Sequence, residues 1–271
     1  MKFGISTFLT DESISPAVLG PALEERGFES VFISEHTHIP VLRETPYPRG
    51  ELPREYYRTL DPFVALTAIA SVTERLLVAT GIALVVERDP IVTAKAVASL
   101  DLVSGGRMIF GMGVGWIREE MRNHGTDPRS RGRLADERMR AMIRLWTEEK
   151  AEFHGEFVDF DPVYSWPKPV QRPHPPIYVG GGEGAFARIA EYGTSWLALG
   201  GRPDRLADQM GQLRRTARRD VPVTVSGTRP EDLQGYAEAG VERVLFRLPT
   251  LPESEALREL DKLAAGISVR P

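Results

Sequence analysis

The chain of 271 residues contains no cysteine, which excludes disulfide bonds, thiol nucleophiles, zinc–thiolate sites and iron–sulfur clusters. It also lacks any run near the roughly 20 apolar residues that a membrane-spanning helix needs. Its first residues, Met1–Ser6, already have strand-like character, so we expect neither a membrane span nor a signal peptide. The net charge of −4 gives no basic excess, and it argues against a nucleic-acid partner.

Short apolar runs rich in β-branched residues alternate with helical segments along the whole chain. The runs are Phe3–Thr7, Ser30–Ser34, Leu76–Val85, Arg107–Phe110, Ile177–Val179, Ser195–Leu199, Val221–Val225 and Arg243–Leu248. Strict alternation implies parallel strands joined by crossover helices. Eight such units predict an α/β fold of one (β/α)8 TIM barrel spanning 1–271, a fold that typically takes about 250 residues. The alternative is an open doubly wound sheet.

Local signals mark where the helices begin and end. The pairs Ser15-Pro16, Asp61-Pro62 and Asp89-Pro90 each place a capping residue before a proline, and Pro230 and Pro252 follow weaker caps. Glycines follow three helical segments and predict their ends: Gly27, Gly193 and Gly240.

Two predicted connections are too long for simple turns. One runs from Glu35 to about Leu60 after the second strand, and the other from Gly111 to about Arg133 after the fourth. Both leave the carboxyl ends of strands, where barrel enzymes build their active sites, and long loops at that end are often lids. The first loop carries the tyrosines Tyr47, Tyr56 and Tyr57. A third proline-rich, irregular stretch covers 153–176.

Glu35 and His36 stand where the second strand ends, a place that indicates catalysis or cofactor contact. The alternative is a solvent-facing loop histidine. His36 and His38 could also share one metal ion, since residues two apart on an extended segment share a face. A catalytic metal site wants a third ligand, and no other histidine has suitable spacing, so we predict no metal.

Gly111-Met112-Gly113-Val114-Gly115-Trp116 follows the fourth strand but lacks the third glycine of a dinucleotide fingerprint. The glycines would either let the backbone approach a flat ring or let small residues pack in a tight barrel. The sequence leaves these two interpretations open.

Gly180, Gly181 and Gly182 follow the fifth strand and precede a helix, a pattern typical of an anion site built from backbone N–H groups. We predict that a phosphate binds there, with a purely structural turn as the alternative. Glu183 would repel a phosphate unless its side chain points away.

The segment 118–144 holds eight arginines and five acids. Charge pairing on a solvated helix face accounts for most of them, whereas the unbalanced run 129–133 could hold an anionic group. The chain has no Gly-x-Ser-x-Gly elbow, no phosphate-binding Gly-x-x-x-x-Gly-Lys motif and no lysine at a strand end.

Taken together, these motifs resemble the luciferase-like monooxygenase superfamily, and most closely its coenzyme F420 (deazaflavin)-dependent oxidoreductase branch. The most specific part is the Leu-Asp-x-x-Ser-Gly-Gly-Arg run that leads into Gly-x-Gly-x-Gly-Trp. The stretches that carry the resemblance are Glu25–His36, Leu60–Phe63, Leu100–Arg107, Gly111–Trp116, His154–Phe157 and Pro175–Gly182.

The resemblance implies a barrel that binds its ring system at the carboxyl ends of the strands. It places His36 and Glu35 beside the ring as catalytic residues, with Trp116 and the glycines Gly111, Gly113 and Gly115 also lining it. It implies a non-proline cis peptide at Gly81-Ile82 that supports the ring, and it assigns the cofactor phosphate to Gly180–Gly182.

Two positions depart from the pattern of the superfamily. Its sugar-phosphate dehydrogenases carry a glutamate where Trp116 stands, so their substrate chemistry does not carry over. The frequent Gly-Asp-Gly-Trp at the sixth strand is Gly193-Thr194-Ser195-Trp196 here.

The resulting hypothesis is an F420-dependent oxidoreductase that transfers a hydride between the cofactor and an organic substrate. One alternative is an FMN-dependent monooxygenase, and a second is a flavin-binding protein without turnover. A metal-dependent hydrolase would need His36 and His38 on one ion. We expect a cytoplasmic protein with a small-molecule substrate, no nucleic-acid or membrane partner, and a possible homodimer.

Overall fold

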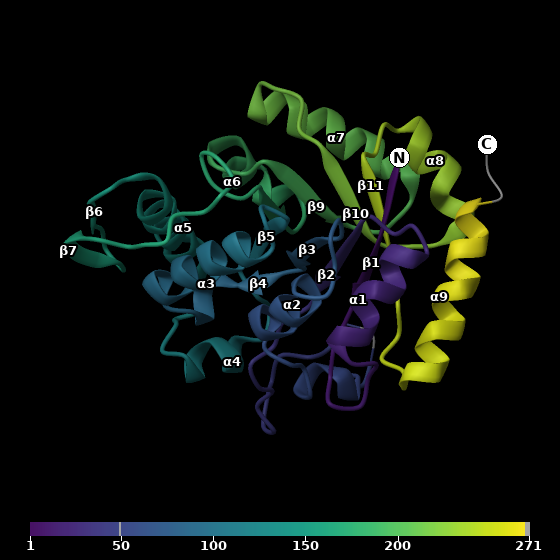
Figure 1. Ribbon diagram of the computed structural model, residues 1–271. Helices are drawn as coiled ribbons and strands as arrows, with labels where there is room; N and C mark the ends of the chain where they lie inside the picture. The colour runs from purple at the N-terminus through teal and green to yellow at the C-terminus, as the bar shows by residue number, and fades with distance from the viewer. Residues whose placement is uncertain (49, 269–271) are drawn as a thin grey trace.

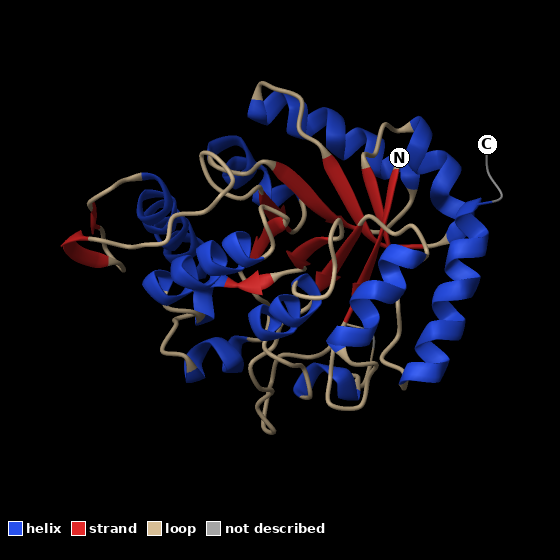
Figure 2. Cartoon of the chain, viewed as in Figure 1, coloured by secondary structure: helices blue, strands red, loops and turns tan. Residues whose placement is uncertain are grey.

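A computed structural model describes residues 1–48 and 50–268 and has a ring of parallel strands surrounded by helices (Figures 1 and 2). Strands that belong to the ring are β1 (Lys2–Thr7), β2 (Ser30–Ile33), β3 (Leu77–Thr80) continued by β4 (Ala83–Leu84), β5 (Met108–Gly113), β8 (Ile177–Gly180), β9 (Ser195–Leu199), β10 (Val223–Thr228) and β11 (Arg243–Arg247).

The ring of strands is closed. β1 pairs in parallel with both β2 and β11, and β3 pairs with β5, so no edge is left open. The predicted (β/α)8 barrel is therefore confirmed, and the open doubly wound sheet is excluded.

The helices begin where the proline pairs predicted. Asp61 accepts hydrogen bonds from the amides of Phe63 and Val64, and Asp89 accepts one from Val92, which satisfies the free N–H groups of the first turn. The helices are α1 (Pro16–Glu25), α2 (Pro62–Ala70), α3 (Pro90–Val103), α4 (Arg118–Asn123), α5 (Arg131–Thr147), α6 (Phe186–Glu191), α7 (Pro203–Ala217), α8 (Leu233–Glu238) and α9 (Glu253–Ser268).

Side chains alternate between the inside and the outside of the barrel, as a pleated strand requires. A small inner cluster fills the barrel itself, and a much larger cluster lies between the strands and the surrounding helices. The inner cluster is formed by Phe32, Ala79, Ile109, Tyr178, Leu197 and Leu245. This alternation decides which residues at the strand ends face the mouth of the barrel.

Three predicted boundaries differ from the structure. The predicted third strand, Leu76–Val85, is divided by an irregular step at 81–82 and ends in the 3-10 turn η2 (Val85–Glu87). The fourth barrel strand, β5, continues to Gly113, because the glycines permit close packing there, so the loop after it starts later than predicted. Within 153–176, predicted as irregular, residues up to Val163 complete an antiparallel hairpin of β6 (Ala151–His154) and β7 (Asp159–Val163), which projects away from the barrel in Figure 1.

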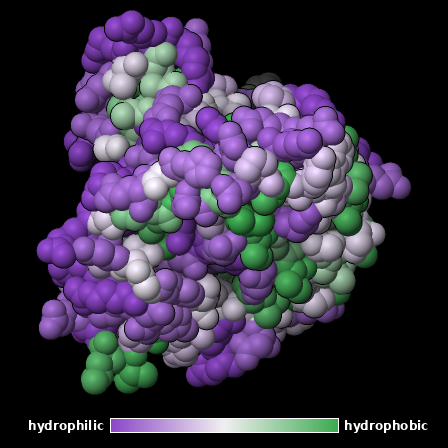
Figure 3. Space-filling model, turned by 90° about the vertical axis from the view of Figure 1, so that its left-hand side faces the viewer, coloured by the Kyte–Doolittle hydropathy of each residue, from purple (hydrophilic) through white to green (hydrophobic). Residues whose placement is uncertain are grey.

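The long loop after β2 contains the 3-10 turn η1 (Arg54–Tyr57) and an apolar tip. Val41 and Leu42 are 93% and 89% exposed there. Figure 3 shows an apolar protrusion at the lower edge of the molecule, at the height where this loop projects in Figure 1. Among the described residues, no helix combines the length and apolarity needed to cross a bilayer.

Candidate functional site

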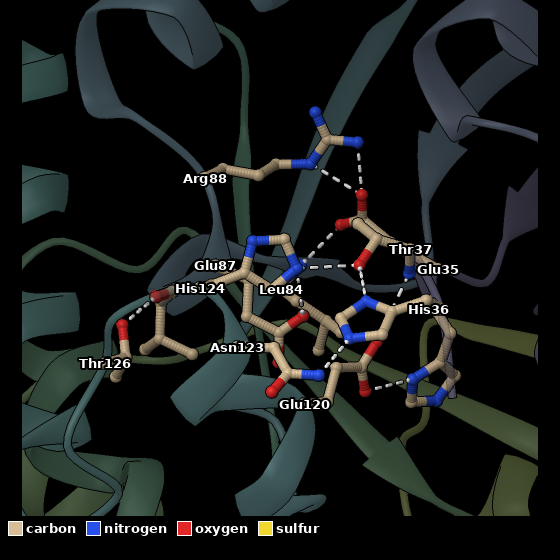
Figure 4. Close-up of polar contacts among 12 residues, drawn as sticks. Glu35, His36, Thr37, Leu84, Glu87, Arg88, Glu120, Asn123, His124 and Thr126 are labelled. Atoms are coloured by element: carbon tan, nitrogen blue, oxygen red, sulfur yellow. Dashed lines mark hydrogen bonds and ion pairs between the residues drawn. The ribbon is translucent and has the colours of Figure 1, made fainter. Parts of the chain in front are cut away.

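Two neighbouring side chains at the end of β2 have different environments (Figure 4). The carboxylate of Glu35 accepts hydrogen bonds from the amide of Leu84 at 2.7 Å and from Nε of Arg88 at 2.6 Å. Arg88 also binds Asp61 at 2.6 Å. Both oxygens of Glu35 are thus already used, so this predicted catalytic residue lies where it positions the backbone after β3.

The imidazole of His36 is held by a buried carboxylate from a distant part of the chain. Its Nδ1 lies 2.8 Å from Oε2 of Glu120, and Oε1 of Glu120 accepts a hydrogen bond from the amide of Thr37 at 3.2 Å. The side chains of His36 and Glu120 are only 6% and 1% exposed. Because an ionised carboxylate only accepts, Nδ1 carries the hydrogen, and Nε2 of the neutral ring remains an acceptor.

Glu120 was missed in the sequence, where the acids of 118–144 were assigned to a solvated, charge-paired face. That assignment is wrong for Glu120, which faces inward from the short helix α4. The signal available was the doublet Glu119-Glu120 in the loop after the fourth barrel strand. For other members of the segment the prediction holds, since Arg140 binds Glu191 and Arg133 binds Glu156 at exposed positions.

Three aromatic rings surround His36. Tyr56 lies 5.1 Å away and Trp116 6.4 Å away between ring centroids, and Tyr47 contacts both Tyr56 and Trp116. Two residues of the predicted tyrosine lid therefore meet the histidine. The third, Tyr57, is 53% exposed, and it makes no ring contact with this group. The loop after β2 and the segment after β5 together supply these rings.

The peptide bond Gly81-Ile82 is cis, which confirms the expectation drawn from the resemblance. The end of β2 holds this segment at several points: Oγ of Ser34 donates to the carbonyl of Gly81 at 3.2 Å, and the amide of Gly81 donates to Ile33 at 2.7 Å. The carboxylate of Glu35 adds the bond to Leu84 described above.

Three of the predicted cofactor glycines make room for this segment of the chain. A Cβ at Gly111 would come within 2.0 Å of the carbonyl oxygen of Thr80, and one at Gly113 within 2.2 Å of the Ile82 side chain. A Cβ at Gly180 would also meet Ile82, at 2.9 Å. Of the two interpretations left open, tight packing within the barrel explains Gly111, and Gly113 and Gly180 seat the side chain of Ile82.

Two further predicted glycines have open surroundings. Gly181 has a φ of +129°, and a Cβ at Gly182 would meet nothing within 4 Å. Within the described residues, neither amide donates a hydrogen bond. Glu183 binds Nε2 of Gln209 at 3.2 Å, so its carboxylate is held by α7. Gly115, with a φ of +65°, lies in the turn that leads to Trp116.

A second group of titratable side chains lies behind His36. Burial and the carboxylates of Glu120 and Glu35 raise the pKa of Glu87 to about 9. Nε2 of His124 lies 3.9 Å from Oε2 of Glu87, and burial lowers the pKa of His124. Glu87 is therefore a protonated acid at neutral pH, one that the sequence gave no signal to find.

His38 does not join His36 around one ion. Its Nδ1 binds Oγ1 of Thr37 at 2.9 Å, and its Nε2 binds Asn123 at 2.9 Å. Across residues 1–48 and 50–268, no group of three or more His, Cys, Asp or Glu side chains is placed to hold a metal ion.

This arrangement can exchange a proton at the mouth of the barrel. Nε2 of His36 has no hydrogen-bond partner among the described residues. Leu199, on the same face of β9 as the inner residue Leu197, is 80% exposed, so the barrel is not capped at this point. A planar ring system has aromatic and aliphatic contacts here, and its anionic tail has the free amides of Gly181 and Gly182.

Comparison with known proteins identifies relatives of the whole chain. The family model described as luciferase-like monooxygenase matches residues 18–258. An uncharacterized protein of Mycobacterium tuberculosis is 39% identical over 284 residues, covering 99% of each chain. An FMNH(2)-dependent dimethylsulfone monooxygenase of Pseudomonas putida is 34% identical over 137 residues, which cover 49% of this chain and 38% of that protein.

Two solved structures share the fold along their whole length. A monooxygenase from Streptomyces bottropensis has a TM-score of 0.80 at 20% identity, covering 99% of each chain. An F420-dependent secondary alcohol dehydrogenase, solved with an F420-acetone adduct, has a TM-score of 0.78 at 16% identity, covering 100% of each chain.

Proposed function

The chain belongs to the luciferase-like monooxygenase family, and from that premise we propose that it is an F420-dependent oxidoreductase. It would transfer a hydride between the deazaflavin and a small organic substrate. The proposal includes the cytoplasmic location and the possible homodimer expected from the sequence.

One observation carries the proposal: a histidine at the mouth of the barrel is fixed through Nδ1 by a buried carboxylate, with Nε2 free. Hydride transfer at an alcohol or carbonyl carbon requires that a proton leave or reach the oxygen. A neutral imidazole is suited to that exchange near neutral pH. The whole-length fold match to an F420-dependent alcohol dehydrogenase is consistent with this chemistry.

The residues at the mouth fit a cofactor with a flat ring and an anionic tail. Ile82 and the cis peptide before it would support one face of the ring, and Trp116 and Tyr56 would enclose the substrate beside it. Gly181 and Gly182 offer two free amides to the phosphate. Next to them, a groove of about 550 Å³ is lined by Arg205 and Arg215 as well as Glu183. When bound, the deazaflavin would supply the hydride-accepting or hydride-donating ring.

His36 would do the acid–base work. For substrate oxidation, Nε2 accepts the hydroxyl proton, and the carboxylate of Glu120 stabilises the imidazolium that results. For reduction the same proton moves in the opposite direction. Glu35 would act as a positioning residue, since its carboxylate holds Leu84 and Arg88.

An FMN-dependent monooxygenase is the second candidate, favoured by the similarity of half the chain to an FMNH(2)-dependent enzyme. A flavin-binding protein without turnover is the third.

Equilibrium binding of F420 and FMN, measured side by side by fluorescence on the purified protein, tests the proposal. Tight F420 binding with weak FMN binding is the expected result. Tight FMN binding accompanied by oxygen consumption with reduced FMN would favour the monooxygenase instead. Tight binding without activity across a panel of alcohols and carbonyl acceptors would favour the third candidate, and binding of neither cofactor would overturn the proposal.

A further inference from the structure

A line of titratable side chains extends from His36 to the surface of the protein (Figure 4). Glu120 follows His36, Glu87 interacts with Glu120, and His124 lies beyond Glu87. These residues come from the end of β2, the turn after β4 and the helix α4, so only the folded chain brings them together.

Glu87 lies in this line without a donor for either oxygen. Its side chain is 1% exposed, and among the described residues neither oxygen has a hydrogen-bond partner. The only nearby guanidinium, that of Arg88, is already bound to Glu35 and Asp61. Two buried carboxylates side by side cannot both stay ionised cheaply, so a proton held by Glu87 and offered to Glu120 satisfies both groups.

His124 links this pair to solvent. Its Nε2 lies 3.9 Å from Oε2 of Glu87, a gap that one bridging water can close. The same nitrogen lies 2.7 Å from Oγ1 of Thr37, which also contacts Nδ1 of His38. The side chain of His124 is 27% exposed, whereas that of His36 is 6% exposed.

We propose that Glu120, Glu87 and His124 form a proton relay between Nδ1 of His36 and solvent. This proposal rests on the proposed function, because it gives the catalytic proton a route that a bound substrate does not block. Tyr56 and Trp116 flank the imidazole on the side where the substrate would lie.

Each step moves one proton and leaves the relay unchanged. When Nε2 of His36 gains a proton from the substrate, Nδ1 gives its proton to Glu120. Glu120 passes a proton to Glu87 as Glu87 gives its own to His124, and His124 releases one to solvent. Substrate reduction uses the same hops in reverse, so no oxidant or other reactant is required.

The relay can be tested on the full chain without any cofactor. Infrared spectroscopy of the wild-type protein should show the C=O band of a protonated carboxyl at pH 7, and this band should fade as the pH rises through about 9. The Glu87→Gln variant should lack the band. The matched control is Glu119→Gln on the same helix as Glu120, which should retain it. A wild-type spectrum with no such band at pH 7 would overturn the proposal.

Exchange of the His36 Nδ1 proton with solvent, followed by NMR on histidine-labelled protein, measures transfer itself. Glu87→Gln keeps the side-chain volume but cannot pass a proton on, so exchange should slow at least ~10-fold, since one relay group is lost. His124→Gln should slow it less, because water can partly replace an exposed group. Equal exchange rates in wild type and Glu87→Gln would refute the relay. Failure to bind F420 would instead refute the proposed function and leave these two readouts unaffected.

Discussion

At the amino end of the barrel, two arginines use their hydrogen-bonding capacity on fixed partners. Arg243, 2% exposed, donates two hydrogen bonds to Glu29 at 2.7 and 2.9 Å and a third to Tyr178. Arg107 directs all five of its N–H groups at neutral oxygens of the surrounding loops. Every donor there has an acceptor in place.

At the carboxyl end the groups around His36 are not balanced in this way. Glu87 and Glu120 share a buried space, and the free nitrogen of His36 has no partner among the described residues. Such an arrangement costs folding free energy and perturbs pKa values, and perturbed pKa values cluster at functional sites.

The contrast teaches where this barrel places stability and where it places chemistry. The run Leu100–Arg107, the most specific part of the sequence resemblance, lies at the amino end and ties loops together. The residues proposed for chemistry lie at the opposite end, as is usual for the fold. Four predictions test this division.

Arg243→Met should cost the most. Removing one partner of a buried ion pair leaves Glu29 without its guanidinium, and we expect a loss of roughly 3–5 kcal/mol in the free energy of unfolding, measured by chemical denaturation. The control Arg140→Met breaks an exposed pair with Glu191 and should cost less than about 1 kcal/mol. F420 binding by the folded Arg243→Met protein should be unchanged; weakened binding with normal stability would break the comparison.

His36→Ala should lower turnover by about 100–1,000-fold, because it removes the proposed general acid–base group. F420 affinity should change only a few-fold. His154→Ala is the control, since His154 lies on the projecting hairpin and binds only Asp159. A large loss of cofactor affinity with unchanged turnover would show that His36 binds rather than catalyses.

Glu87→Gln should change how stability depends on pH. Between the ordinary glutamate pKa of 4.5 and the raised value of about 9, the folded protein keeps a proton that the unfolded chain releases. Its stability therefore falls as pH rises through this window, by roughly 2–3 kcal/mol between pH 6 and 8. Denaturation midpoints across that range should show a flatter curve for the variant; parallel curves would mean that Glu87 is ionised in the folded state.

Gly181→Ala should have the smallest effect. Its φ of +129° disfavours a Cβ, so we expect a shifted turn and an F420 affinity lower by about 10-fold, equivalent to roughly 1–2 kcal/mol. Gly182→Ala is the matched control, because its φ of −91° and open surroundings accept a methyl group. Equal F420 affinities in titrations of the two variants would argue against a phosphate on this turn.

Local sequence signals were sufficient for the barrel and for the position of His36. Repeated strand–helix units imply parallel strands, and the pairs Asp61-Pro62 and Asp89-Pro90 start helices through bonds to their own first turn. These signals work because strand pairing and capping depend on residues close in the chain. The cis peptide at Gly81-Ile82 was expected only through the resemblance, since nothing in its own residues requires it.

Only the tertiary structure decided which side chains surround the histidine. Glu120 is 84 residues from His36 in sequence, and it is one of several acids in an arginine-rich segment. Local charge pairing predicted a solvated face there, but the turn after β5 aims this one carboxylate inward. Burial then changes its chemistry: away from water, charges interact strongly and protons are retained. The sequence by itself therefore determined the barrel and the end of it that carries the site, whereas long-range packing decided which carboxylates act on His36.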